Sequence, residues 1–75
     1  MAKIVFPAIK VIDVYDIDDK TKFLFTLKKY PSDKQSCYIW VAENKEGNKL
    51  AEKQFMEHSK IEQIRFAFKK ELKMI

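Results

Sequence analysis

A single helix is expected in this chain, at its C-terminal end. At 100° per residue, one narrow apolar stripe forms from Ile61, Ile64, Phe68, Leu72 and Ile75. Ser59 and Glu62 have the spacing of a capping box at the start of that stripe. The pattern predicts a helix over about residues 60–74, and it leaves the rest of the fold to strands.

The residues before the helix have β character and are divided by polar turn signals. Four strands are expected at about residues 8–17, 22–30, 36–42 and 49–55. A short apolar run at residues 4–6, stopped by Pro7, suits a further edge strand. Gly47, the only glycine, is expected at positive φ in the last hairpin loop. The fold class is therefore α+β, a single domain over residues 1–75 with an antiparallel meander of four or five strands and one C-terminal helix on one face.

The expected sheet is apolar on both faces, but one helix covers only one of them. Two sets of side chains alternate along the third strand: Cys37, Ile39 and Val41 on one face, and Tyr38, Trp40 and Ala42 on the other. We expect Tyr38, Trp40 and Leu24 on the uncovered face, with Lys22 and Lys28 at its edge. The alternative is that residues 1–9, or bending of the sheet, cover these rings.

A second candidate interface lies on the helix. Phe66 is about 140° from Ile61 on the helical wheel, on a charged face that includes Lys69, Lys70 and Lys73. A phenyl ring in such surroundings suits a partner protein, and the lysines suit an anionic one. The alternatives are a singly exposed apolar residue and a solvated helix face.

The charge is modest and unevenly distributed. The net charge is +4, with −2 over residues 1–19 and +6 over residues 20–75. Fourteen of the fifteen basic residues are lysines, and Arg65 is the only arginine. Because arginine supplies the bidentate fork that reads guanine, sequence-specific base recognition is disfavoured, whereas loose phosphate attraction is not.

The composition argues against catalytic and metal chemistry. One glycine cannot build a phosphate-binding loop, and one Cys with one His cannot make a tetrahedral zinc site. Cys37 and His58 have no third group to orient them as nucleophile and base. Asp13, Asp16 and the adjacent pair at residues 18–19 suit a solvated turn better than a calcium loop. We expect no enzyme, no cofactor and no metal.

No apolar run reaches the length of a membrane span or of a signal peptide, and the unpaired Cys37 suits a reducing compartment, so a cytoplasmic location away from membranes is expected. The element order resembles that of small single-stranded nucleic-acid-binding domains of the Pur-alpha type, although the Gly and Arg richness of that family is missing.

The expected function is that of a small non-enzymatic binding protein acting through a macromolecular interface. Its concrete form is a phage or mobile-element inhibitor or regulator of a host protein. The alternatives are a sequence-tolerant single-stranded nucleic-acid-binding protein that uses an aromatic sheet face, and a self-assembling subunit, such as a homodimer, that pairs through edge strands.

Overall fold

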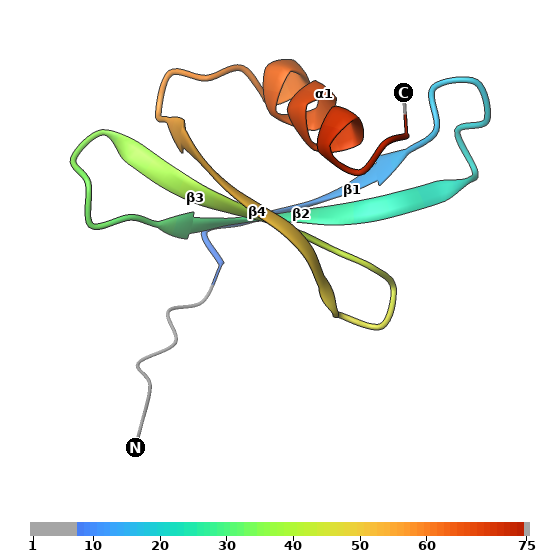
Figure 1. Cartoon of the computed structure of the whole chain (residues 1–75), viewed down its shortest axis with the longest axis horizontal. Coiled ribbons are helices and arrows are strands. Elements are labelled where there is room, and N and C mark those ends of the chain that lie inside the picture. The colour runs from blue at the N-terminus through green and yellow to red at the C-terminus, as the bar shows by residue number, and fades with distance from the viewer. Residues whose placement is uncertain (1–7, 75) are drawn as a thin grey trace.

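The computed structural model describes residues 8–74 and contains four strands followed by one helix (Figure 1). The elements are β1 (Lys10–Tyr15), β2 (Phe23–Pro31), β3 (Cys37–Glu43), β4 (Lys49–Met56) and α1 (Ile61–Glu71). The strands form one antiparallel sheet in the order β1-β2-β3-β4. The expected α+β meander with a C-terminal helix is confirmed, whereas the expected strand at residues 4–6 lies outside the described residues.

The first turn of α1 is capped differently from the expectation. Lys60, not Ser59, is the N-cap residue, and its N–H donates to Oε1 of Gln63 at 3.4 Å. The N–H of Ser59 instead donates to the carbonyl of Met56 at 2.9 Å, within the turn that follows β4. The predicted capping box of Ser59 and Glu62 is therefore wrong, because the turn places Ser59 outside the helix.

The helix ends at Glu71, three residues before the expected end. Lys73 has a φ of 58°, and its N–H donates to the carbonyl of Lys70 at 3.1 Å. The N–H of Met74 donates to the carbonyl of Lys69 at 2.8 Å. These two bonds form a Schellman motif, in which a left-handed residue turns the chain back and satisfies the last carbonyls of the helix.

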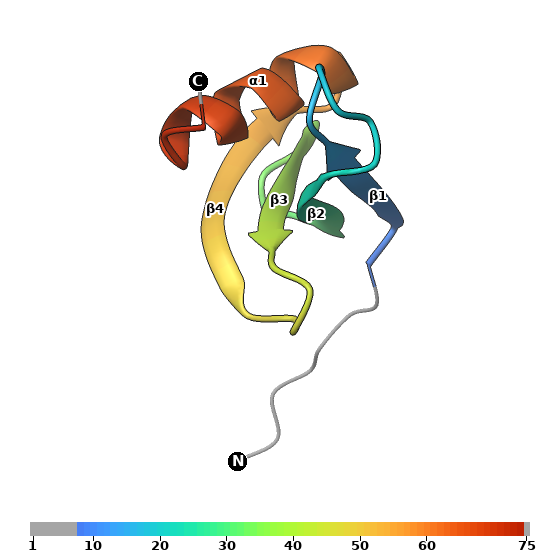
Figure 2. The ribbon, with the colours of Figure 1, turned by 90° about the vertical axis from the view of Figure 1, so that its right-hand side faces the viewer.

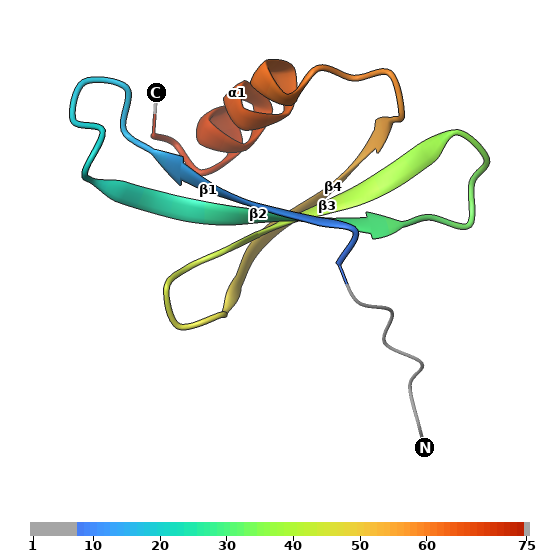
Figure 3. The same cartoon turned by 180° about the vertical axis from the view of Figure 1, so that it is seen from behind.

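One face of the sheet carries the core. Strand pairing places Ile12, Leu27 and Ala42 side by side on that face. The buried cluster joins five sheet residues to two from α1: Val14, Phe25, Leu27, Trp40, Ala42, Ile64 and Phe68. The Phe68 ring lies 6.3 Å from that of Phe25 and 6.0 Å from that of Phe55, centroid to centroid. The opposite views of Figures 1 and 3 show α1 on this one side of the sheet, and β4 bends towards it in Figure 2.

The set of side chains that faces away from the helix is the opposite of the expected one. Lys28, Val41 and Glu52 are neighbours in the register, and so are Tyr30, Ile39 and Gln54. Both rows alternate with the core residues, so they belong to the outer face. Trp40 is only 4 % exposed and belongs to the core. Its predicted place on the uncovered face is wrong, because alternation separates two faces without telling which of them the helix covers.

Leu24 also lies elsewhere than expected. Val14 pairs with Phe25 but Tyr15 pairs with Phe23, so Leu24 is the extra residue of an irregularity in the β1–β2 ladder. Such a bulge redirects the side chain locally. Leu24 packs against the core cluster instead of the outer face.

Candidate functional site

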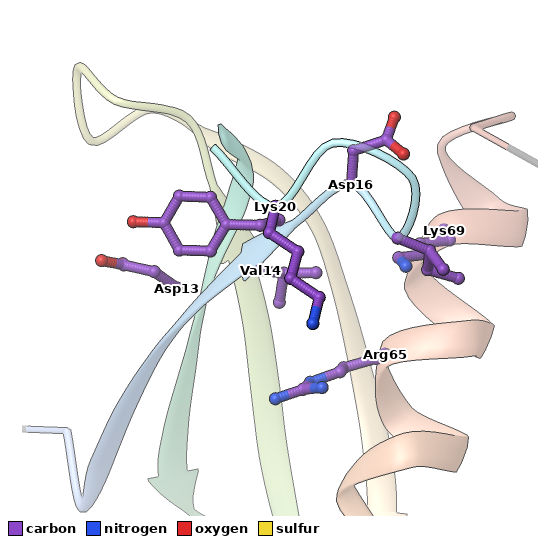
Figure 4. Close-up of a pocket in the computed structure, with 8 residues that line it drawn as sticks. Asp13, Val14, Asp16, Lys20, Arg65 and Lys69 are labelled. Carbon is purple, nitrogen blue, oxygen red and sulfur yellow. The ribbon is translucent and has the colours of Figure 1, made fainter. Parts of the chain in front are cut away.

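A cleft of about 370 Å³ lies between the C-terminal end of β1, the β1–β2 loop and α1. We call it the cationic cleft; it is lined by Asp13, Val14, Tyr15, Asp16, Ile17, Lys20, Arg65 and Lys69 (Figure 4). Val14 is part of the core, so the cleft reaches down to the apolar interior. Its wall comes from two parts of the chain that only the folded structure brings together.

Three basic side chains approach one another in the cationic cleft. In Figure 4 the ammonium group of Lys20 points from the loop towards the guanidinium group of Arg65, which extends from α1. Lys69, one helical turn further on, is only 7 % exposed. Nε of Arg65 is buried and has no hydrogen-bond partner. Within residues 8–74, none of these three side chains forms an ion pair.

The carboxylates near the cleft are already used within the sheet and the loop. Asp13 Oδ1 accepts a hydrogen bond from Thr26 Oγ1 at 3.0 Å, and Asp16 Oδ1 accepts one from the Asp18 N–H at 2.9 Å. In Figure 4 the carboxylate of Asp16 points away from Arg65. Asp13 and Asp16 line the same cleft as the three cations, but no carboxylate of the described residues lies within ion-pair distance of them.

The acidic residues of the β1–β2 loop serve to close the turn. Asp19 Oδ1 accepts hydrogen bonds from the hydroxyl of Thr21 at 2.6 Å and from its N–H at 3.1 Å. Both bonds stabilise the carboxylate and therefore lower the pKa of Asp19. The bond from the Thr21 hydroxyl has the larger effect. Among residues 8–74, no group of three or more His, Cys, Asp or Glu side chains is placed to hold a metal ion.

A second hollow, of about 320 Å³, adjoins the cleft on the outer side of α1. We call it the Phe66 groove; it is lined by Ile17, Glu62, Arg65, Phe66 and Lys69. Phe66 is 59 % exposed and Ile17 is 73 % exposed. The sequence indicated Phe66 but missed Ile17, which was assigned to a strand. The signal that could have indicated it is an isolated isoleucine between two aspartates.

The other candidate residues do not join this site. Tyr38 is half-buried, with Nζ of Lys29 4.0 Å from its ring centroid. Lys28 pairs with Glu43 at 2.8 Å on the outer face, and the hydrogen bond that Lys28 donates to Glu43 raises the pKa of Lys28. Lys22, Lys70 and Lys73 are exposed and line neither hollow. Of the predicted interface residues, only Phe66 and Lys69 line the Phe66 groove.

Cys37 and His58 lie outside the cationic cleft and the Phe66 groove, and they belong to different segments of the chain. Cys37 lies at the start of β3, half-buried, and alternates with Tyr38 onto the outer face. His58 is exposed in the connection between β4 and α1, where its Nε2 lies 3.6 Å from Oε1 of Glu57. Neither residue lines the cationic cleft or the Phe66 groove.

No protein-family model, curated protein or solved structure matches this chain. Within the part of the chain that the structure describes, no helix has the length and apolar character needed to span a membrane.

Proposed function

We propose that this chain is a non-enzymatic binding protein whose Phe66 groove receives an apolar side chain of a partner protein. The observation that carries the proposal is the exposure of Phe66 and Ile17 on the two walls of one groove. Aromatic side chains in concave, partly apolar surroundings are frequent anchors of protein interfaces. A phage or mobile-element inhibitor or regulator of a host protein is the concrete form that the small size of the chain favours.

The charge around the groove favours a partner segment with an acidic residue beside the apolar one. Arg65 and Lys69 line the groove together with a single carboxylate, that of Glu62. An acidic group next to the bound apolar side chain would meet these two cations, and complementary charge of this kind speeds association and excludes basic partners.

Single-stranded nucleic acid is the alternative partner, but the protein offers fewer accessible aromatic rings for base stacking than the sequence predicted. Trp40 is buried in the core, and Tyr38 is in contact with Lys29. Base stacking needs an accessible ring face. The exposed lysines remain available to phosphates, so binding of nucleic acid is kept as one outcome of the test.

The test starts with capture from a cell lysate, to obtain a candidate partner, and is decided with the purified partner. Phe66→Ala is expected to weaken binding about tenfold or more, as for an interface anchor. Met56→Ala is the matched control, because Met56 is 65 % exposed on β4 and lines neither hollow. Equal losses in both variants would contradict the proposal.

Two further measurements separate the alternatives. Binding of a labelled oligonucleotide at low salt that is lost at high salt, without capture of a protein, would favour the nucleic-acid function. A dimer found by light scattering and abolished by Phe66→Ala would make a second copy of the chain the partner, whereas a dimer that this variant leaves intact would favour pairing through the edge strands β1 or β4.

A further inference from the structure

The cationic cleft has an unusual charge arrangement for a small domain. Lys69 is more than nine-tenths buried and lines both the cleft and the adjoining groove, yet it makes no ion pair within residues 8–74. Nζ of Lys69 is not among the buried nitrogen atoms that lack a partner, so the burial lies in its methylene stem and the ammonium group remains accessible to a ligand. Arg65 adds a buried Nε without a hydrogen-bond acceptor.

The geometry of the donors indicates what would compensate them. Lys20 approaches from the β1–β2 loop, while Arg65 and Lys69 approach from α1 (Figure 4). A carboxylate offers two oxygens in one plane, whereas a phosphoryl group offers oxygens in several directions and carries up to two charges. Donors that arrive from two sides are therefore satisfied better by a tetrahedral dianion.

The remaining wall of the cleft is partly apolar. Val14 and Ile17 line it. Such a wall can contact the organic part of a ligand, whereas an inorganic ion has no apolar part to place against it. We infer that the cationic cleft binds a phosphomonoester, with its phosphoryl group on Lys20, Arg65 and Lys69 and its apolar body against Val14 and Ile17.

This site shares Ile17, Arg65 and Lys69 with the Phe66 groove, so a bound phosphomonoester and a bound partner would compete for them, but each can be tested alone. Phe66 lines the groove but not the cleft, so Phe66→Ala is expected to leave phosphomonoester binding unchanged. Failure of one proposal therefore leaves the other intact.

The experiment is an amide NMR titration of the full chain with phenyl phosphate at constant ionic strength and at about pH 7.5, above the second pKa of a phosphomonoester at about 6. Saturable shifts are expected for the amides around Asp16, Lys20 and Arg65. Inorganic phosphate and phenylacetate are titrated in parallel, and each is expected to bind several-fold more weakly than phenyl phosphate.

Variants assign the effect to the cleft. Arg65→Gln and Lys69→Gln are expected to weaken phenyl phosphate binding about tenfold or more, the usual effect of losing a charge-assisted hydrogen bond. Lys70→Gln removes the same charge from an exposed position of the same helix and is expected to change binding less than about twofold. Lys20 lies in an exposed loop. Lys20→Gln therefore tests the contribution of the cleft even if a helix variant fails to fold.

Three outcomes would overturn the inference. The first is the absence of saturable shifts with phenyl phosphate. The second is an equal loss of affinity for phenyl phosphate in Lys70→Gln and Lys69→Gln, which would mean that the overall positive charge of the protein attracts the ligand. The third is equal affinity for phenylacetate, or for inorganic phosphate, which would remove the preference for a phosphoryl group or for an apolar body.

Discussion

Lys73 occupies a backbone conformation that favours glycine. Its φ of 58° lies in the left-handed region, where the Cβ of an L-residue crowds its own carbonyl, yet the Schellman motif at the end of α1 requires it. We expect Lys73→Gly to raise the free energy of unfolding by about 1 kcal/mol. Urea denaturation followed by far-UV circular dichroism measures the change.

Lys70→Gly is the matched control for this prediction. Lys70 is exposed within α1, so glycine there is expected to lower the free energy of unfolding by about 0.5–1 kcal/mol. Effects of the same sign in the two variants would mean that the backbone at Lys73 is not strained.

At the scale of elements, the turn between β1 and β2 contains hydrogen bonds from Thr21 to the carboxylate of Asp19. The hydrogen bonds from Thr21 lower the pKa of Asp19 in the folded protein below the ordinary value of 3.8. The unfolded chain therefore takes up this proton at a higher pH than the folded protein does. The stabilisation from Asp19 is complete above the unfolded pKa and is lost as the pH falls through the folded one.

Asp19→Ala is expected to destabilise the protein at neutral pH and to have a progressively smaller effect as the pH falls below 3.8 and the wild-type carboxylate becomes protonated as well. Unfolding curves recorded across this range test the prediction. Asp33→Ala, in the exposed β2–β3 turn, serves as the control. A destabilisation by Asp19→Ala that does not change with pH would show that the charge has no part in the turn.

At the scale of the whole molecule, the sheet and the helix share one core and are expected to unfold together. Phe68 is fully buried between Phe25 and Phe55, at the centre of that core. Phe68→Ala is expected to cost about 3–5 kcal/mol, a large part of the stability of a domain of this size. Denaturation followed separately by circular dichroism and by Trp40 fluorescence should show coincident, weakened transitions.

Phe66→Ala, two residues away on the same helix, is the control. Because Phe66 is mostly exposed, this change is expected to alter the free energy of unfolding by about 0.5 kcal/mol or less. Similar losses in the two variants would mean that α1 does not pack on the sheet through the face described above.

Element type and order could be predicted from the sequence, because periodicity is a local property of neighbouring residues. Alternation marked the strands, and the helical stripe marked Ile64 and Phe68 as core residues. The positive φ of Gly47, 85° in the structure, also followed from local turn chemistry. The boundaries depended on hydrogen bonds that no pattern shows, such as those that make Lys60 the N-cap and stop the helix at Glu71.

The candidate site was only half predictable. Phe66 was identified because its position on a helical wheel needs no tertiary information, and the structure confirms that it is exposed. Trp40 was assigned to the wrong face, and Ile17 and Lys20 were not expected near Arg65. Their proximity arises from a loop and a helix that are far apart in the sequence.

By itself, then, the sequence determined that an antiparallel sheet of four or five strands carries apolar residues on both faces and has one helix with which to cover them. Only the tertiary structure decided which face is covered, since α1 packs on Phe25, Trp40 and their neighbours and leaves Ile39 and Val41 on the outer face. The physical reason is that alternation is symmetric between the two faces of a sheet. Long-range packing of the helix breaks that symmetry, and the same packing brings Arg65 and Lys69 to the β1–β2 loop.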